Sequence, residues 1–298
     1  MVDPLARFSP PTREWFASVF AAPTAVQAEA WRAIAAGEHA LVVAPTGSGK
    51  TLAAFLWAID SLGSGTVVGS GTRVVYVSPL KALGVDVERN LRAPLTGIRL
   101  AAERLGTPLA DVTVGVRSGD TTSRERAALL RRPPDILITT PESLYLMLTS
   151  SARQTLTGIQ TVIVDEIHAV AGTKRGSHLA VSLERLDALV GRDVQRVALS
   201  ATVRPIERVA AFLGGDRPVT VVAPPAEKRW DVTVRLPVED IADPGPPPGT
   251  AAATDPLLAG PGTDTLTADA PADSSIWPHV EQQVYETALR GRSTLIFT

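Results

Sequence analysis

The stretch from Ala44 to Thr51, which reads APTGSGKT, has the composition of a loop that binds phosphate groups. It follows the short apolar run of residues 39–43 and precedes the apolar-faced run of residues 52–59, so we expect a buried strand before it and a helix after it. The glycines let backbone N–H groups turn toward phosphate oxygens, and the helix N-terminus adds free donors and a positive dipole end. This context predicts a phosphate-binding loop rather than a surface turn that merely ends in Lys-Thr.

Each residue type in this loop has an expected contact with a bound nucleotide. Lys50 is expected to reach the β- and γ-phosphates, and Thr51 to offer its hydroxyl to Mg²⁺. The general pattern begins with glycine, whereas this chain has Ala44, a recognised variant that narrows the type of nucleotidase. The loop residues predicted to bind ATP are Thr46, Gly47, Ser48, Gly49, Lys50 and Thr51.

A second run places two adjacent carboxylates, Asp165 and Glu166, directly after the apolar residues 161–164. Parallel α/β sheets form their sites at the carboxyl ends of strands. We expect Asp165 to hold Mg²⁺ directly or through water, and Glu166 to act as the general base for the attacking water. An isolated Asp-Glu pair is as often a solvated loop end, but after a phosphate loop in the same α/β unit it predicts hydrolysis. With Lys50, these carboxylates and His168 form the predicted catalytic set.

The composition bounds the kind of protein that carries these residues. The chain has 298 residues, of which 45% are hydrophobic, and it has no cysteine, so a disulfide framework and a cysteine-based metal site are excluded. The N-terminus lacks the regions of a secretory signal, and no apolar run approaches the roughly twenty residues of a membrane span. We therefore expect a cytoplasmic protein without a membrane segment.

The net charge of −2 conceals an uneven distribution. Residues 1–235 carry 27 Lys and Arg against 22 Asp and Glu, whereas residues 236–298 carry 2 basic and 9 acidic residues. The part with the motifs is therefore mildly basic, which permits nucleic-acid binding without requiring it, and an ordinary solvated surface gives the same balance.

Short Val- and Ile-rich runs alternate with amphipathic stretches along the first 222 residues, which predicts an α/β fold with a mainly parallel sheet flanked by helices. The predicted strands are residues 40–44, 73–78, 112–116, 135–139, 161–164, 195–200 and 219–222. The predicted helices are residues 80–92, 123–131, 142–148, 177–190 and 205–213. Seven strands suffice for one RecA-like domain.

The chain changes character after residue 241. Residues 229–237 alternate as a further strand, but residues 242–275 are dominated by Pro, Gly, Ala, Thr and Asp and contain no Lys, Arg or aromatic residue. This composition is typical of a disordered linker, and a long ordered loop is the alternative. Residues 277–290 then predict a helix, and residues 293–298 a buried strand.

Three of these segments, taken in order, resemble motifs I, II and III of superfamily 2 helicases of the DEAD/DEAH-box type: APTGSGKT, DEIH at residues 165–168 and SAT at residues 200–202. The resemblance implies that His168, Ser200 and Thr202 couple ATP hydrolysis to the binding of a nucleic-acid strand. PTAVQ at residues 23–27 resembles the Q motif, in which Gln27 reads adenine.

Further segments resemble the parts of these helicases that grip a nucleic-acid strand. SPLKAL at residues 78–83 resembles motif Ia, TTPESL at 139–144 resembles the TPE segment, and SGDT at 118–121 falls where a family loop touches nucleic acid. Small polar side chains and backbone N–H groups of such segments contact phosphates. The residues that line the track by this resemblance are Pro79, Leu80, Lys81, Gly119, Thr140 and Pro141.

DEIH together with SPLKAL and TTPESL is most similar to the large helicase-related family, Lhr, over roughly residues 7–240 and the last twenty or so. Lhr helicases are bacterial and archaeal ATP-dependent enzymes associated with DNA repair. The resemblance implies ATP and Mg²⁺ as cofactors, and single-stranded nucleic acid as partner, with DNA favoured over RNA.

The resemblance also predicts the domain organisation: residues 1–240 form the first RecA-like domain, 241–275 a linker or insertion, and 276–298 the truncated start of a second RecA-like domain. In such motors the second domain supplies arginine fingers. We therefore expect the chain to bind ATP·Mg²⁺ weakly, to turn over very slowly and not to unwind. The alternatives are an ATP-gated nucleic-acid clamp, a DEAD-box RNA helicase, which the DEIH form disfavours, and a helicase subunit of a restriction system.

Overall fold

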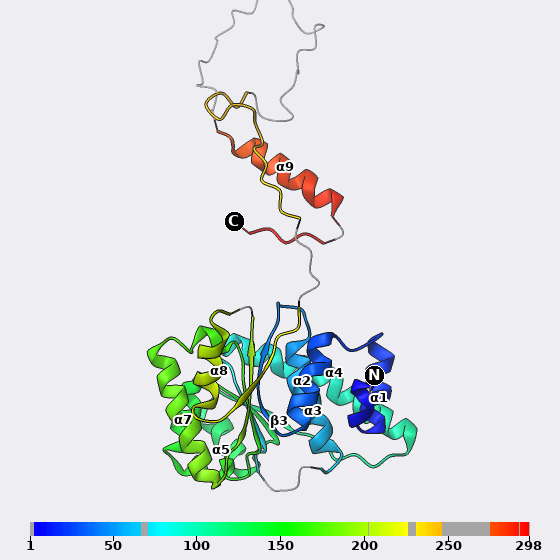
Figure 1. Cartoon of the computed structure of the whole chain (residues 1–298), viewed down its shortest axis with the longest axis vertical. Helices are drawn as coiled ribbons and strands as arrows, with labels where there is room; N and C mark the ends of the chain where they lie inside the picture. The colour runs from blue at the N-terminus through cyan, green and yellow to red at the C-terminus, as the bar shows by residue number, and fades with distance from the viewer. Residues whose placement is uncertain are drawn as a thin grey trace, which may run out of the picture. The chain divides into compact units, whose positions relative to one another are not determined.

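The computed structural model describes residues 3–66, 71–201, 203–225, 231–245, 275–291 and 293–297. The chain divides into two compact units, Met1–Glu227 and Lys228–Thr298. The first unit is a three-layer α/β domain in which helices cover both faces of one sheet (Figure 1).

Seven parallel strands form this sheet in the order β3-β4-β2-β5-β6-β1-β7. The strands are β1 (His39–Val43), β2 (Val74–Val77), β3 (Val114–Arg117), β4 (Ile136–Thr139), β5 (Thr161–Val164), β6 (Gln195–Ser200) and β7 (Val219–Val222). All seven were predicted within two residues of their observed bounds. Most of them are buried on both faces, which is why they read as continuous Val and Ile runs rather than alternating patterns.

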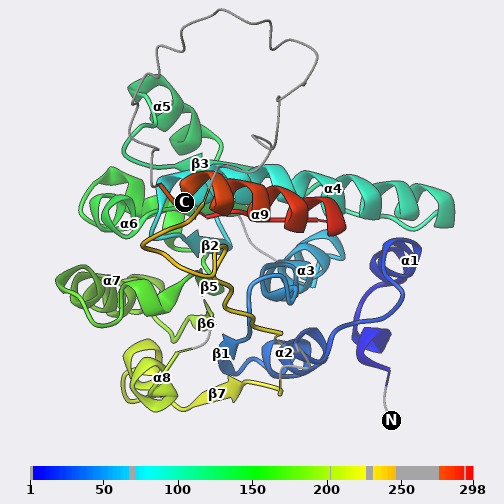
Figure 2. The same cartoon turned by 90° about the horizontal axis from the view of Figure 1, so that it is seen from above.

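The helices of the first unit are α1 (Pro10–Val19), α2 (Ala25–Ala35), α3 (Lys50–Gly63), α4 (Lys81–Leu105), α5 (Ser123–Arg131), α6 (Pro141–Leu148), α7 (Lys174–Val190) and α8 (Ile206–Gly214). Of these, α1 and α2 precede β1, and each of the first six strands is followed by a helix. Three 3-10 turns, η1 (Pro4–Arg7), η2 (Ser151–Leu156) and η3 (Ile167–Ala169), complete this unit as described. Figure 2 shows α1 to α4 on one side of the sheet and α6 to α8 on the other.

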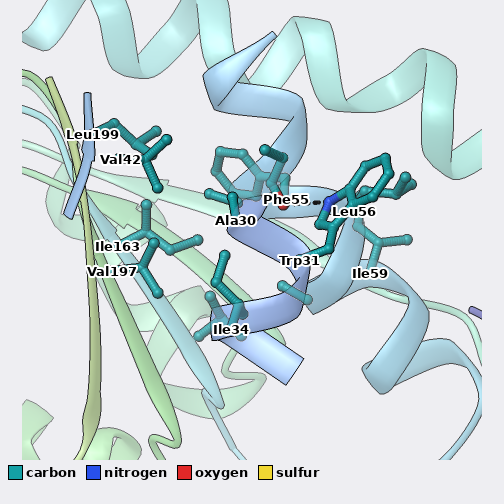
Figure 3. Close-up of a cluster of buried hydrophobic side chains, with 14 of the residues drawn as sticks. Ala30, Trp31, Ile34, Val42, Phe55, Leu56, Ile59, Ile163, Val197 and Leu199 are labelled. Atoms are coloured by element: carbon teal, nitrogen blue, oxygen red, sulfur yellow. Dashed lines mark hydrogen bonds between the residues drawn. The ribbon is translucent and has the colours of Figure 1, made fainter. Parts of the chain in front are cut away.

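Two apolar cores lie on the two faces of the sheet. On the first face, Trp31 of α2 and Phe55 of α3 pack toward Ile163 and Val197 of the sheet (Figure 3). The indole Nε1 of Trp31 donates to the Ala53 carbonyl over 3.0 Å, which satisfies the polar atom of this fully buried ring. This contact joins α2 to α3, the helix that begins inside the predicted phosphate loop.

The helix α4 extends well beyond its predicted end at residue 92 and passes through Pro94. Proline in a helix interior removes one backbone hydrogen bond and usually ends the helix. Here α4 packs closely along α1: a Cβ atom placed on Gly97 would lie 2.2 Å from the Trp15 ring. Packing against α1 thus stabilises the helix beyond the proline.

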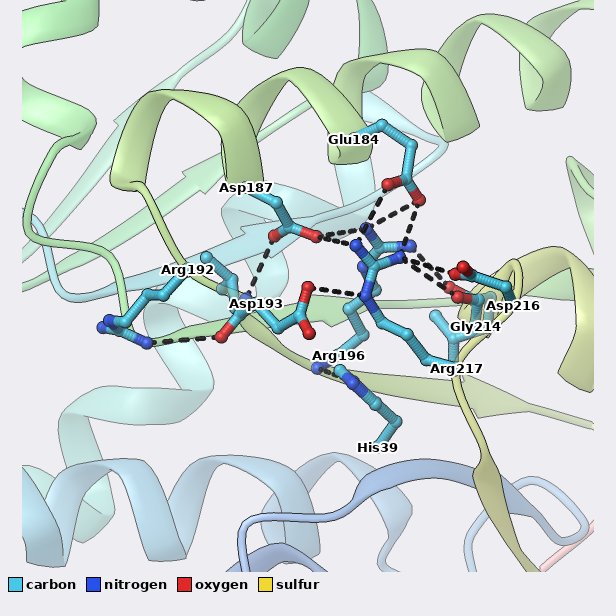
Figure 4. A network of polar contacts seen from close by, with 11 residues as sticks. His39, Glu184, Asp187, Arg192, Asp193, Arg196, Gly214, Asp216 and Arg217 are labelled. Carbon is cyan, nitrogen blue, oxygen red and sulfur yellow. Dashed lines mark hydrogen bonds and ion pairs between the residues drawn. The ribbon is translucent and has the colours of Figure 1, made fainter.

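A buried ion network lies at the amino end of β6, the edge of the sheet away from the predicted phosphate loop (Figure 4). The guanidinium of Arg196 is 2% exposed and pairs with Asp187 over 2.6 Å and with Glu184 over 2.9 Å. Arg217 pairs with the same two carboxylates. Since buried charges are costly unless paired, this network ties α7, β6 and the segment after α8 together.

The described part of the second unit contains one helix, α9 (Trp277–Arg290), which matches its prediction. Two predicted strands were wrong: within the described residues 231–237 and 293–297 no strand forms, and Val232, Val234 and Phe297 are each at least 79% exposed. A strand needs a partner strand for its backbone hydrogen bonds, and an alternating or apolar pattern does not specify that partner. Most of the predicted linker, residues 246–274, lies outside the described residues, so its disorder stays a prediction.

Candidate nucleotide site and nucleic-acid face

The predicted phosphate loop connects β1 to α3 and holds two glycines in the left-handed region. Gly47 has φ of +82° and Gly49 has φ of +85°, conformations that residues with a side chain rarely adopt. A Cβ atom on Gly49 would also lie 2.5 Å from Nε2 of Gln27. Thr46, Gly47 and Ser48 lie in the turn itself, and Lys50 and Thr51 begin α3, so the loop has the arrangement expected from its sequence.

The ammonium group of Lys50 bends back over the loop. Its Nζ donates to the carbonyls of Ala44 and of Pro45, the latter over 2.9 Å. Burial lowers the pKa of Lys50, while the carboxylates of Glu166 and Asp165 act in the opposite direction. The lysine is therefore half-buried at the loop and lies within electrostatic reach of both predicted catalytic carboxylates.

Asp165 follows β5 and is held from two sides. Its backbone N–H donates to the Val77 carbonyl of β2 over 2.9 Å. Its Oδ1 accepts the Glu166 N–H over 2.9 Å, and its Oδ2 accepts the hydroxyl of Tyr76. The carboxylate is 9% exposed and thus has a fixed orientation at the carboxyl edge of the sheet.

Glu166 has a strained backbone, and its carboxylate contacts His168. Its φ of +43° makes it the one non-glycine residue with positive φ in the described part of the chain. Its Oε2 lies 3.4 Å from Nδ1 of His168, and the same Nδ1 lies 3.0 Å from the buried Oγ of Ser200 at the end of β6. The predicted base, the predicted coupling histidine and Ser200 thus form one chain of contacts. Thr202 lies outside the described residues.

Gln27 is buried between α2 and the phosphate loop. Its side chain completes the capping box of α2, with Oε1 accepting the Thr24 N–H over 3.0 Å, and its Nε2 donates to the Gly49 carbonyl over 3.4 Å. The Thr24 hydroxyl reaches the Ser48 carbonyl over 3.1 Å. The structure therefore brings Gln27 to the loop as predicted, and its reading of adenine stays a prediction.

The strand order separates the two predicted sets of site residues along the carboxyl edge of the sheet. The residues predicted to bind the nucleotide follow β1, β5 and β6, which are neighbours in the sheet. The residues predicted to bind the nucleic-acid strand follow β2, β3 and β4, which are also neighbours. The two sets meet where β2 pairs with β5, in a register that places Tyr76 opposite Ile163 and Val77 opposite Val164. Local sequence patterns do not predict this division, because strand order depends on tertiary packing.

The residues predicted to bind the nucleic-acid strand differ in solvent exposure. Leu80 is 59% exposed and Gly119 is exposed, whereas Thr140 and Pro141 are buried at the start of α6. The Thr140 hydroxyl caps α6 by accepting the Ser143 N–H over 3.4 Å, so the structure gives it a local role as well. The side chain of Lys81 lies outside the described residues. A hollow of about 610 Å³ beside Gly119 is lined by Val85, Val116, Ser118, Asp120, Thr121, Glu125, Ala128, Leu129 and Arg132.

Two contacts at this edge were missed by the sequence analysis. One is the hydrogen bond from Tyr76 to Asp165, for which a single tyrosine within the aliphatic strand VVYV is the available signal. The other is the ion pair between Arg175 of α7 and Glu142 of α6, which lowers the pKa of Glu142 to about 2 through its hydrogen bond with Arg175. It joins the segment after DEIH to the TPES segment.

The residues of the nucleotide site fit ATP with Mg²⁺. A Cβ atom on Gly47 would meet nothing within 4 Å, so the loop backbone is open there, and the Ser48 Oγ is buried without a partner in the described structure. Thr51 and Asp165 offer hydroxyl and carboxylate oxygens, the ligands that Mg²⁺ prefers, and Mg²⁺ bound to nucleotides uses few protein ligands. The described residues contain no cluster of three or more His, Cys, Asp or Glu that could hold a metal ion.

A phosphate loop and a strand-end Asp-Glu pair on a parallel sheet with helices on both faces define a RecA-like domain of the phosphate-loop nucleotidase class. The chain belongs to the DEAD/DEAH box helicase family, whose family model matches residues 24–209. It is 56% identical over 296 residues to the Lhr helicase/probable uracil glycosylase of Mycolicibacterium smegmatis and 53% identical over 298 residues to the Lhr helicase/uracil glycosylase of Escherichia coli.

These matches cover nearly all of this chain but a small part of the relatives. The chain spans 18% of the length of each of the two Lhr proteins. Its structure is similar to that of Mycobacterium smegmatis helicase Lhr bound to ssDNA and AMP-PNP, with a TM-score of 0.79 over 98% of this chain and 34% of that chain. No helix in the described ranges is long and apolar enough to cross a membrane.

Proposed function

We propose that this chain is the ATP-binding lobe of an ATP-dependent helicase or translocase that moves on single-stranded nucleic acid. The observation that supports this most is the convergence of Lys50, Asp165 and the His168–Ser200 contact at the ends of three neighbouring strands. A phosphate loop alone would fit any nucleotidase. The histidine that links the predicted base to the end of β6 is the part that a motor requires, because a motor must transmit hydrolysis to its track.

In the proposed mechanism the chain binds and orients ATP through the loop backbone, with Lys50 turning from the carbonyls of Ala44 and Pro45 toward the β- and γ-phosphates. Thr51 and Asp165 would hold Mg²⁺, which when bound neutralises charge that develops on the phosphates. Glu166 accepts the proton of the attacking water at a carboxylate oxygen. The two carboxylates have different partners: that of Glu166 contacts His168, whereas that of Asp165 accepts from Tyr76 and from the Glu166 N–H.

The coupling step is assigned to His168, Ser200 and Thr202. When Glu166 gains a proton, its interaction with His168 over 3.4 Å changes, and His168 carries the change to Ser200 over 3.0 Å. The carboxyl ends of β2, β3 and β4 form the other half of the edge. This half binds the nucleic-acid strand through residues 79–81, Gly119 and the start of α6. Burial of Thr140 and Pro141 favours contacts from the backbone there rather than from these two side chains.

We propose DNA rather than RNA as the track, in line with the similarity to an Lhr structure bound to ssDNA. The proposal includes a cytoplasmic location and a role in DNA repair, both of which rest on the Lhr resemblance. It also keeps the predicted domain organisation, with residues 276–298 opening a second RecA-like domain. Because arginine fingers of such motors come from that domain, the 298 residues are expected to bind ATP and DNA without separating strands.

Equilibrium binding of a labelled single strand tests this proposal. The fluorescence anisotropy of one 20-nucleotide sequence is measured as DNA and as RNA, with the chain, in the presence of Mg²⁺ and a non-hydrolysable ATP analogue and then without nucleotide. We expect nucleotide-dependent binding, tighter for the DNA, and no strand separation on a tailed duplex. Equal affinity with and without nucleotide contradicts the proposed coupling, and measurable unwinding contradicts the proposed single-lobe role.

A further inference from the structure

Tyr76 has an environment unlike that of the other residues of its strand. It is the polar member of β2, it is fully buried, and its ring packs against Phe55 of α3 with centroids 4.8 Å apart. Its hydroxyl donates to Oδ2 of Asp165 on the neighbouring strand end. A buried tyrosine hydroxyl needs a partner, and here that partner is the predicted Mg²⁺ ligand.

The Tyr76 hydroxyl is the donor in this contact, and the Asp165 carboxylate is the acceptor. A hydrogen bond to a carboxylate is about twice as strong as one between neutral groups.

Asp165 has no other side-chain donor in the described structure. Its Oδ1 accepts the backbone N–H of Glu166, which fixes one oxygen, and Tyr76 fixes the other. Each carboxylate oxygen has two lone pairs, so both keep one acceptor site free. The pair of bonds therefore sets the rotation of the carboxylate without using up its capacity to bind a cation.

We propose that Tyr76 is a positioning residue that orients the Asp165 carboxylate for Mg²⁺ bound with ATP, an inference that rests on the proposed function. Carboxylates that ligate metals are themselves held by hydrogen bonds, and loss of such a partner typically weakens metal binding by about 10–100-fold. Tyr76 also belongs to β2, which leads into Ser78 and Leu80. It therefore connects the predicted Mg²⁺ site with the residues predicted to bind the nucleic-acid strand.

The test uses Tyr76→Phe, which removes one oxygen and keeps the ring against Phe55. The Mg²⁺ concentration that gives half-maximal binding of a fluorescent ATP analogue is measured for the wild-type chain and the variant. We expect Tyr76→Phe to raise it about tenfold, with the limiting affinity at saturating Mg²⁺ within threefold of wild type. Tyr145→Phe is the matched control, because Tyr145 lies on α6 against His178, and it should change neither value.

Two results contradict the proposal while leaving the proposed function intact: wild-type Mg²⁺ dependence in Tyr76→Phe, or lower affinity at every Mg²⁺ concentration without a shift in the half-maximal value. A wild-type chain that binds no nucleotide contradicts both. In the background of Asp165→Asn, which removes the carboxylate, Tyr76→Phe should add no further shift, and an equal shift there contradicts a role through Asp165.

A second measurement does not depend on how well the variant folds. The chain has three tyrosines, Tyr76, Tyr145 and Tyr285. With all three replaced by 3-fluorotyrosine, the ¹⁹F resonances are assigned from Tyr145→Phe and Tyr285→Phe. Addition of Mg²⁺ to the nucleotide-bound chain should shift the remaining resonance, that of Tyr76, and leave the other two in place. An unmoved Tyr76 resonance contradicts the proposal.

Discussion

Nδ1 of His168 lies 3.0 Å from Oγ of Ser200, which joins the turn after β5 to the end of β6. Ser200 is fully buried, so its hydroxyl has few other partners to choose from. The same histidine nitrogen lies 3.4 Å from Glu166. One imidazole therefore contacts both the predicted general base and the first residue of the SAT segment that resembles motif III, which is the arrangement that coupling would use.

Removal of the Ser200 hydroxyl should separate nucleotide binding from strand binding. In Ser200→Ala we expect affinity for the ATP analogue within twofold of wild type, because no loop residue is altered, and at least a fivefold loss of the nucleotide-dependent gain in single-strand affinity. Anisotropy titrations with and without nucleotide measure both. Ser182→Ala removes a similarly buried hydroxyl on α7 and should keep the gain. Equal behaviour of the two variants contradicts the coupling role.

Glu166→Gln should abolish proton acceptance while retaining ATP. The amide is isosteric and keeps a contact with His168, so nucleotide affinity should stay within threefold, whereas hydrolysis should fall by about 10²–10⁴-fold, as expected for loss of a general base. Single-turnover hydrolysis with the chain in excess over labelled ATP gives the rate. Glu207→Gln on the exposed side of α8 serves as control. Unchanged turnover in Glu166→Gln would falsify the assignment.

Gly176 is required by a close approach rather than by its backbone angles. A Cβ atom there would lie 2.0 Å from the Val170 carbonyl oxygen, so Gly176→Ala must displace the first turn of α7 from the loop that carries His168. We expect a loss of about 1–3 kcal/mol or more in the free energy of unfolding, measured by urea denaturation. Gly172→Ala is matched to it, since a Cβ atom there meets nothing within 4 Å. Equal stability of the two variants contradicts the packing argument.

The ion network at the amino end of β6 should stabilise the fold without serving the site. Arg196→Ala removes the closer arginine partner of the buried Asp187, at 2.6 Å, and leaves Arg217 at 3.1 Å. Because breaking a buried pair completely costs about 3–5 kcal/mol, we expect a loss of about 3 kcal/mol in the free energy of unfolding. Urea denaturation of this variant and of Arg208→Ala, an exposed arginine on α8, measures the difference, with less than about 0.5 kcal/mol expected for the control. A loss in Arg196→Ala no larger than that of Arg208→Ala contradicts the stabilising role of the network.

The elements and the nucleotide half of the site were predictable because they depend on local patterns. Buried parallel strands give apolar runs such as residues 161–164, and a phosphate loop needs glycines at fixed positions, as at Gly47 and Gly49. The Asp165–Glu166 pair was recognisable because it follows one of these runs. Such signals lie within a few residues of one another in the chain.

The features that were not predicted from the sequence depend on contacts between residues that lie far apart in the chain. The pairing of β2 with β5, where the two halves of the edge meet, the bond from Tyr76 to Asp165, and the packing of Gly97 against Trp15 each join segments more than 80 residues apart. The strand predicted for residues 229–237 failed for the same reason, since an alternating pattern needs a partner strand that its own residues do not specify.

The central claim is that the loop from Ala44 to Thr51 binds the phosphates of ATP, and binding of a fluorescent ATP analogue in the presence of Mg²⁺ tests it most directly. We expect saturable binding by the wild-type chain and by Lys174→Ala, whose lysine is exposed at the start of α7, and at least a tenfold loss in Lys50→Ala. Circular dichroism checks that all three are folded. Equal affinity of the folded Lys50→Ala and wild-type chains would contradict the account.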